Sequence, residues 1–273
     1  MSKVDFAKMA AAGNDFILVD NRNNAVGKKV KNLSRFARVV CERKLSVGAD
    51  GLLVVEKSRK ADVTMRIFNP DGGEVTMCGN GSRCVALYAA KKGIAGKKLS
   101  IQTKAGVLNA QVGRDVARIE MMPPKEFKSR FSIDVYDETF EVDFVNTGVP
   151  HVVYFVDDIE KFDVKRFGKE IRYHKEFASE GTNANFVKVV DRHDIVLRTY
   201  ERGVEDETFA CGTGAVASAI VASELHSVEP PVKVKTWGGD VLTIHFKKVK
   251  DKYKDVFLEG GVRLIYEGSV DYV

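Results

Sequence analysis

The chain has 273 residues, enough for one large domain or two of ordinary size. Hydrophobic residues make up 44% of it and charged residues 30%, which is typical of a water-soluble globular protein. The formal net charge of +5 is spread along the chain without a basic block, so we expect no nucleic-acid partner. No apolar run approaches the roughly 20 residues that span a bilayer, and no signal peptide is apparent, so we expect no membrane partner and a cytoplasmic location.

Cysteine usage agrees with that location. The chain has four cysteines, too few for a disulfide framework, and we expect them to be reduced thiols. The sequence contains neither a Cys-x-x-Cys pair nor a His-x-x-x-His spacing, so it predicts no metal site. The cysteines are Cys41, Cys78, Cys84 and Cys211.

The first half of the chain is predicted to form short strands and two helices. Residues 32–44 carry apolar side chains at helical spacing, which is typical of an amphipathic surface helix, and Asn32 can cap it. Residues 81–92 are apolar nearly all round, which predicts a helix buried on every side. Residues 69–73 have the composition of a turn. Strands are predicted at residues 14–20, 51–55, 61–68, 99–103, 106–112 and 116–121.

The second half repeats this arrangement. Residues 158–173 contain an amphipathic helix, and residues 214–224 are again apolar all round. Residues 147–151 have the composition of a turn. Strands are predicted at residues 140–145, 152–156, 182–190, 195–200, 232–236, 240–246 and 255–259.

The repeat can be tested by subtracting the residue numbers of matching positions in the two halves. Matching residues recur 133 positions apart: 211 − 78 for two cysteines, 236 − 103 for two threonines, and 239 − 106 and 181 − 48 for two pairs of glycines. Arg198 follows Arg66 by 132 positions, a slip of one residue. A period this long indicates two homologous domains rather than a solenoid.

Each half carries a cysteine directly before Gly-polar-Gly at the start of its apolar helix, namely Cys78 and Cys211. Free backbone N–H groups and the positive end of the helix dipole lie at such a position, so we expect a lowered thiol pKa. One thiolate can remove a proton from a substrate carbon while a thiol returns one to the opposite face, which inverts the carbon without redox chemistry. Backbone N–H groups near Gly79 and Gly212 can stabilise the charge that develops on an adjoining carboxylate.

Several segments together resemble the diaminopimelate epimerase family over nearly the whole chain. They are Gly-Asn-Asp-Phe (13–16), Phe-Asn-Pro-Asp-Gly (68–72), Met-Cys-Gly-Asn-Gly-Ser-Arg-Cys (77–84), Glu-Arg-Gly (201–203) and Ala-Cys-Gly-Thr-Gly-Ala (210–215). The resemblance implies an α/β (α+β) fold of two pseudo-symmetric domains, each a mostly antiparallel β-roll or barrel around a central buried helix, with the active site in the interdomain cleft. The expected domains are residues 1–122 with a C-terminal strand at about 264–273, and residues 125–263.

The resemblance also implies an activity. The family interconverts LL- and meso-2,6-diaminopimelate, a step of lysine and peptidoglycan precursor biosynthesis, without pyridoxal phosphate, metal or another cofactor. It implies a small-molecule substrate, a two-base mechanism with Cys78 and Cys211 as acid and base, and an enzyme compatible with a homodimer. The implied substrate-binding residues are Asn14, Asn69, Gly79, Asn80, Asn183, Glu201, Arg202, Gly212 and Thr213, with supporting roles for His151 and Gly51.

Two positions depart from the family pattern. Members usually have Gly-Asn-Pro-His where this chain has Gly148, Val149, Pro150 and His151, so one polar contact to the substrate is missing or replaced. Gly51 stands where some members have a glutamine that binds substrate, while others have glycine. These departures concern substrate specificity rather than proton transfer.

Two other functions fit part of the pattern. Proline or hydroxyproline racemases share the two-cysteine logic, but they typically have His after the first Cys-Gly, where this chain has Asn80. A dithiol redox protein would instead cycle Cys78 and Cys211 through a disulfide.

The remaining candidates have structural explanations. Cys84 lies six residues past Cys78, about 240° round the helix, and is expected in the core. Cys41 is expected to be structural, and Trp237 to serve packing. Asp71 and Arg83 are also candidates for the site, although a role in the turn explains Asp71 and a place on the helix surface explains Arg83.

Overall fold

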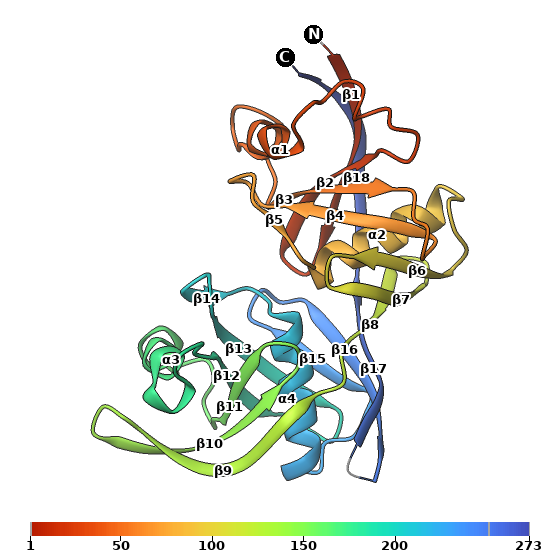
Figure 1. Cartoon of the computed structure of the whole chain (residues 1–273). Helices are drawn as coiled ribbons and strands as arrows, with labels where there is room; N and C mark the ends of the chain where they lie inside the picture. Colours follow the sequence, from red (N-terminus) through yellow and green to blue (C-terminus); the bar gives the residue numbers. More distant parts are fainter. Residues whose placement is uncertain (1, 251, 273) are drawn as a thin grey trace. The chain divides into compact units, whose positions relative to one another are not determined.

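A computed structural model describes residues 2–250 and 252–272. Met1 and Val273, at the outer ends of the expected first domain and last strand, lie outside the described residues. The chain divides into two compact units (Figure 1). Unit 1 comprises the described residues up to Glu120 together with Gly260 to Tyr272, and unit 2 comprises those from Met121 to Glu259.

Unit 1 is built from nine strands and two helices of the described residues. Its main strands pair in the order β18-β1-β2-β3-β4-β6-β7-β8, and β5 pairs with β4. The pairs β2–β3 and β4–β6 are parallel and the others antiparallel. The elements are β1 (Ser2–Ala11), β2 (Asn14–Asp20), α1 (Leu33–Cys41), β3 (Gly51–Glu56), β4 (Val63–Phe68), β5 (Glu74–Val75), α2 (Gly79–Lys91), β6 (Lys98–Thr103), β7 (Gly106–Val112), β8 (Val116–Glu120) and β18 (Arg263–Tyr272).

Helix α2 is the centre of unit 1. It contacts β1, β2, β3, β4, β6, β7, β8 and β18. All of its residues from Asn80 to Leu87 are buried, which the apolar pattern of the sequence predicts for Cys84 to Leu87. Helix α1 packs outside the sheet and buries only one face, which includes Phe36 and Val40, against residues of β2 and β3. Asn32 caps it, because its side chain accepts the N–H of Arg35 at 2.9 Å.

Unit 2 has the same strand order. Its main strands pair as β9-β10-β11-β12-β13-β15-β16-β17, with β11–β12 and β13–β15 parallel and the others antiparallel. Strand β14 pairs with β13, and the central helix α4 contacts β10, β11, β12, β13, β15 and β16. The elements are β9 (Lys125–Val135), β10 (Glu138–Asn146), β11 (Pro150–Phe155), α3 (Val164–Tyr173), η1 (Lys175–Phe177), β12 (Asn183–Val189), β13 (Asp194–Glu201), β14 (Asp206–Thr208), α4 (Gly212–Leu225), β15 (Val232–Thr236), β16 (Val241–Val249) and β17 (Lys252–Gly261).

The repeat extends to individual contacts. In unit 1, Arg66 binds Glu74 through two hydrogen bonds of 2.8 and 3.1 Å. In unit 2, Arg198 binds Glu207 in the same way at 2.6 and 2.9 Å. A bidentate pair at matching places of both units agrees with the duplication inferred from the sequence.

The expected fold class, sheet-rich α/β with a mostly antiparallel roll around a buried helix, is confirmed. Four strands were not predicted, namely the short β5 and β14 and the long β1 and β9. Charged residues such as Asp5 and Lys8 interrupt the apolar alternation of β1, and the first six residues of β9 are exposed and give no pattern. His151 was expected in a turn, but it lies in β11, which begins at Pro150. None of the helices in the described part combines the length and apolar character needed to cross a membrane.

Candidate active site

The first cysteine lies at the start of α2. Cys78 is the N-cap of this helix, with extended backbone, and its sulfur accepts the N–H of Gly81 at 3.5 Å. Its carbonyl oxygen accepts the N–H of Ser82 at 2.8 Å. The side chain of Cys78 is only partly buried. The helix therefore presents a thiol together with the backbone N–H groups of its first turn, including Gly79 and Asn80.

Asn80 and Asn14, which the sequence predicts as binding residues, are in direct contact. Nδ2 of Asn80 donates to Oδ1 of Asn14 at 2.8 Å and to the carbonyl of Ala12 at 3.3 Å. Asn14 in turn donates to a carboxylate oxygen of Asp50 at 3.2 Å. Arg83 donates to Oδ1 of Asn80 at 2.6 Å. The prediction that Arg83 lies on the helix surface was wrong: its side chain is fully buried.

Two other predicted residues of unit 1 lie at strand ends. Gly51 begins β3, and a Cβ atom there would lie 3.1 Å from the carbonyl oxygen of Phe68, so a larger side chain would crowd the neighbouring strand. Asn69 follows β4 in an exposed turn, where its N–H donates to the carbonyl of Gly73 at 2.8 Å. The turn predicted at residues 69–73 is therefore confirmed, and Asn69 is held in it by its backbone.

The second cysteine repeats the first arrangement in unit 2. Cys211 is the N-cap of α4, and its sulfur accepts the N–H of Gly214 at 3.4 Å. The hydroxyl of Thr213 lies 3.5 Å from the same sulfur. Unlike Cys78, the Cys211 side chain is buried, with 5% of its surface exposed. Both helices therefore begin with a cysteine that caps the N–H three residues ahead.

The expectation that the helix start lowers the thiol pKa was wrong for Cys211. Burial, and after it the negative charge of Glu201, raise the pKa of this thiol to about 12. The hydrogen bonds from Thr213 and from the N–H of Gly214 act in the opposite direction but are outweighed. In this state of the protein Cys211 holds its proton at neutral pH.

Three polar residues of unit 2 cluster where β12 begins and β13 ends. Oδ1 of Asn183 accepts the N–H of Arg202 at 2.8 Å, and its Nδ2 donates to the carbonyl of Pro150 at 2.9 Å. The guanidinium of Arg202 donates to the carbonyl of Glu180 at 3.2 Å. Glu201 accepts the hydroxyl of Thr208 at 3.0 Å, and burial raises the pKa of its carboxyl. The cluster thus holds one cationic and one anionic side chain on adjacent residues.

His151 lies beside this cluster on β11, paired with Asn183 across the parallel strands. Its side chain is fully buried, and Nδ1 lies 3.1 Å from Nδ2 of Asn185. Burial lowers the pKa of His151 to about 3, and the charge of Arg202 contributes. The imidazole is therefore neutral at physiological pH and does not titrate near it.

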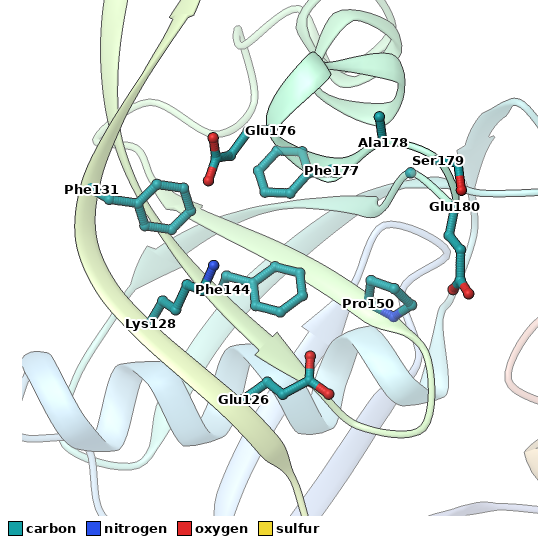
Figure 2. Close-up of a pocket in the computed structure, with 11 residues that line it drawn as sticks. Glu126, Lys128, Phe131, Phe144, Pro150, Glu176, Phe177, Ala178, Ser179 and Glu180 are labelled. Atoms are coloured by element: carbon teal, nitrogen blue, oxygen red, sulfur yellow. The ribbon is translucent and has the colours of Figure 1, made fainter.

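A cavity of about 400 Å³ lies in unit 2 (Figure 2). Phe131, Phe144 and Phe177 form its apolar wall, and the rings of Phe144 and Phe177 stack with centroids 5.9 Å apart. Pro150 and Glu180 also line it, and their carbonyl oxygens accept the bonds from Asn183 and Arg202. This cavity therefore borders the polar cluster through backbone groups.

The sequence did not identify three partners of these residues: Asp50, Thr147 and Asn185. The repeat gives no signal for them, because the offset changes within these segments. The strand register matches Gly51 with Asn183 and Phe16 with His151, so Asn14 corresponds to Val149. Within the described residues, no group of three or more His, Cys, Asp or Glu side chains is arranged to hold a metal ion.

Comparison with known proteins defines first the class and then the family. Two solved structures share the fold over nearly the whole chain. A phenazine biosynthesis protein of the PhzF family from Bacillus anthracis superposes with a TM-score of 0.74 at 18% identity, covering 100% of both chains. A probable proline racemase from Agrobacterium radiobacter K84 superposes with a TM-score of 0.67 at 15% identity, covering 98% of this chain and 93% of the other. At these identities the likeness concerns the fold alone.

Sequence similarity goes further. The family described as diaminopimelate epimerase matches residues 6–127 and again residues 144–265. The diaminopimelate epimerase of Aquifex aeolicus (strain VF5) is 42% identical over 277 aligned positions, which cover 98% of each chain. The chain therefore belongs to the diaminopimelate epimerase family, and it is an isomerase of the amino-acid epimerase type.

Proposed function

We propose that this enzyme interconverts LL- and meso-2,6-diaminopimelate by a two-base mechanism, as a step of lysine and peptidoglycan precursor biosynthesis. One observation carries the proposal: Cys78 and Cys211 cap the central helices of two repeated units through the same sulfur contact. Both lie in the segments that match the family. Each cysteine would serve one face of the same α-carbon.

The chemistry balances without a redox partner. The thiolate of one cysteine removes the α-proton, and the electron pair of the broken C–H bond moves onto the α-carboxylate. The thiol of the other cysteine gives its proton to the opposite face of the carbon. The reaction ends with the protonation states of the two sulfurs exchanged, so the next turnover requires proton exchange or the reverse substrate.

The remaining residues would bind the substrate. Backbone N–H groups of the helix starts, at Gly79, Asn80, Gly212 and Thr213, suit the α-carboxylate, where charge develops. The other polar residues suit the ammonium groups and the distal carboxylate: Arg202 offers a forked donor, Glu201 an anion, and the amides both kinds of group. The amides are those of Asn14, Asn69 and Asn183, and His151 and Gly51 would support the site from within their strands.

Three finer points belong to the same proposal. We take the two homologous domains to divide near residues 122–125, and the twofold match to the family supports this. We take the enzyme to work in the cytoplasm, where thiols stay reduced, and the described cysteines are free. We also take it to form a homodimer, which size-exclusion chromatography with light scattering would test.

Deuterium incorporation tests the proposal. The reduced protein is incubated with LL-diaminopimelate in D₂O without added cofactor, and deuterium at the α-position is followed by mass spectrometry. We expect exchange together with formation of the meso isomer. Exchange into proline but not diaminopimelate would favour a proline racemase, and a reducible Cys78–Cys211 disulfide without exchange would favour a redox protein.

Cysteine variants test the mechanism. We expect Cys78→Ala and Cys211→Ala each to abolish epimerisation, because inversion needs an acid and a base on opposite faces. Cys41→Ala is the matched control, since Cys41 is a buried thiol of α1 with no role in the proposal. Full activity in either of the first two variants would refute the two-base mechanism.

A further inference from the structure

Arg83 lies in the interior of unit 1, one turn inside α2 from the cap at Cys78. Its side chain is 0% exposed. Removing a guanidinium from water costs several kcal/mol unless its solvation is replaced by hydrogen bonds and charges. A fully buried arginine is therefore unfavourable at a position whose only role is to pack the core.

The second repeat shows that this fold does not require a cation there. Val216 matches Arg83 (216 − 83 = 133) and is equally buried in α4. Thr213 matches Asn80 (213 − 80 = 133), the residue to which Arg83 donates. Unit 2 forms the same helix and sheet with a valine at this position. The role of Arg83 is therefore particular to unit 1.

This role follows from hydrogen bonds that join four side chains in a row, from Arg83 to Asp50. Arg83 donates to Oδ1 of Asn80 at 2.6 Å, and Nδ2 of Asn80 donates to Oδ1 of Asn14 at 2.8 Å. Nδ2 of Asn14 donates to Asp50 at 3.2 Å. A guanidinium can only donate and an ionised carboxylate can only accept, so the chain has one direction and both amides have one orientation.

Further contacts support the same orientation at each end. The carbonyl of Ala12 also accepts from Nδ2 of Asn80, at 3.3 Å, so a reversed amide would place two oxygens together. The second oxygen of Asp50 is bound by Arg43 at 2.8 Å. The side chain of Asn14, at the first position of β2, therefore has one N–H and one oxygen lone pair left for another partner. The hydrogen bonds fix which end of the amide carries each of them.

We propose that Arg83 is a positioning residue for substrate binding, which acts through Asn80 to fix which end of the Asn14 amide donates and which accepts. The inference rests on the proposed function, because it takes Asn14 to be a residue that binds the substrate. A fixed amide offers its N–H without the cost of ordering it at each binding event.

A double-mutant cycle on the KM for LL-diaminopimelate tests the proposal. Arg83→Met keeps an unbranched, flexible side chain and removes its donors, and Asn14→Ala removes the amide on which it acts. We expect each change to raise KM by about tenfold, with a smaller loss in kcat. The double variant is expected to match Asn14→Ala alone, because no amide is left to orient. Increases in KM that multiply would overturn the proposal.

A conservative variant separates positioning from packing. Arg83→Lys retains a cation that can only donate, so we expect it to recover part of the KM lost in Arg83→Met. Equal KM values in the lysine and methionine variants would indicate that Arg83 serves packing alone and would overturn the proposal.

Asp50→Asn probes the opposite end of the chain, where the side chain is 36% exposed. It replaces a group that only accepts by one that can also donate. We expect KM to rise in the otherwise unchanged protein and to stay constant in the Asn14→Ala background. If Arg83→Met does not fold, the double-mutant cycle of Asp50→Asn with Asn14→Ala tests the proposal in its place. Increases in KM that multiply in that cycle would overturn the proposal.

Deuterium exchange by the unchanged protein is measured first. Absence of exchange into LL-diaminopimelate would overturn the proposed function and the role of Arg83 with it. Exchange combined with multiplying KM effects would overturn the role of Arg83 alone.

Discussion

Thr147 donates its hydroxyl proton to the backbone carbonyl of Thr213 at 3.2 Å. In unit 1 the side-chain amides of Asn14 and Asn80, 2.8 Å apart, join the start of β2 to the start of α2. Thr213 matches Asn80 by the offset of 133, whereas the strand register matches Asn14 with Val149, two residues after Thr147. The two units thus join the turn into this strand to the start of the central helix with different chemical groups. The copies have diverged at positions that the proposed mechanism gives to substrate binding.

The turn that Thr147 anchors also carries Val149, at the position where the family usually has asparagine. The N–H of Thr147 donates to the carbonyl of Val149 at 3.2 Å, and the Val149 side chain is half-buried. Val149→Asn would supply a donor and an acceptor there. We expect it to lower the KM for LL-diaminopimelate roughly threefold to tenfold with little change in kcat, because such a contact is made equally in the ground and transition states.

Steady-state kinetics in both directions would check this effect. Val190→Asn is the matched control, since Val190 is 58% exposed in the turn between β12 and β13. An unchanged KM in Val149→Asn would mean that another group already makes the contact.

A second prediction concerns the thiol of Cys211. Burial raises its pKa to about 12, and the charge of Glu201 adds to the increase. Glu201→Gln removes that charge, so the thiolate becomes less unfavourable and the pKa of Cys211 should fall. It should stay above the ordinary value of about 8.5, because burial is the larger cause.

The thiolate absorbance can be titrated as the difference between each protein and its Cys211→Ala version, which isolates this one thiol. Glu138→Gln, at an exposed residue of β10, serves as the control. A transition of Cys211 at an ordinary thiol pKa in the unchanged protein would contradict the burial argument. So would a pKa that rises in Glu201→Gln.

The sequence predicted those structural features that are determined within one segment of the chain. The caps at Cys78 and Cys211 and the buried helices follow from Gly-polar-Gly before apolar residues, and all of that information lies within one segment. The sheet-rich fold and its repeat follow from the offset between the two halves. The six exposed residues at the start of β9 offered no pattern, because that strand is held by its pairing with β10.

The contacts of the site were harder to predict because they join distant segments. Asp50 reaches Asn14 across 36 positions, and only the folded chain brings them together. The pKa of Cys211 was predicted with the wrong sign for the same reason, since burial is a tertiary property and outweighs the local helix start. The burial of Arg83 likewise depends on the strands that surround α2.

A third prediction uses the ion pair of unit 1. The hydrogen bonds from Arg66 lower the pKa of Glu74 from 4.5 to about 2, and Lys104 contributes. A carboxyl whose pKa is lower in the folded state stabilises the fold above its unfolded pKa and loses that effect as pH falls through its folded pKa. We therefore expect Glu74→Gln to lower the free energy of unfolding at neutral pH by about 1–3 kcal/mol.

The deficit should shrink between about pH 4.5 and about pH 2, where the native carboxylate itself becomes protonated. Urea unfolding at a series of pH values would measure it, with Glu138→Gln as an exposed control. A deficit that is constant across this range would show that the charge of Glu74 is not what stabilises the pair.

The last prediction concerns Gly214, whose N–H donates to the sulfur of Cys211. A Cβ atom on Gly214 would lie 2.4 Å from Oδ1 of Asn185 and 3.3 Å from the Cys211 sulfur. Asn185 has little freedom to move, because Thr199 donates to its Oδ1 at 3.0 Å and its Nδ2 donates to the carbonyl of Val152 at 2.8 Å. The added methyl group must therefore displace the thiol or strain the buried amide.

We expect Gly214→Ala to lower the free energy of unfolding by about 1–3 kcal/mol, as overpacking does. It should lower kcat for epimerisation roughly a hundredfold, because a sulfur displaced by about 1 Å no longer meets the α-carbon in line. Gly261→Ala is the control, since nothing lies within 4 Å of its added Cβ. Circular dichroism and the deuterium assay would report the two effects separately. Wild-type kcat in a folded Gly214→Ala protein would mean that the thiol position set by this N–H is not required for proton transfer.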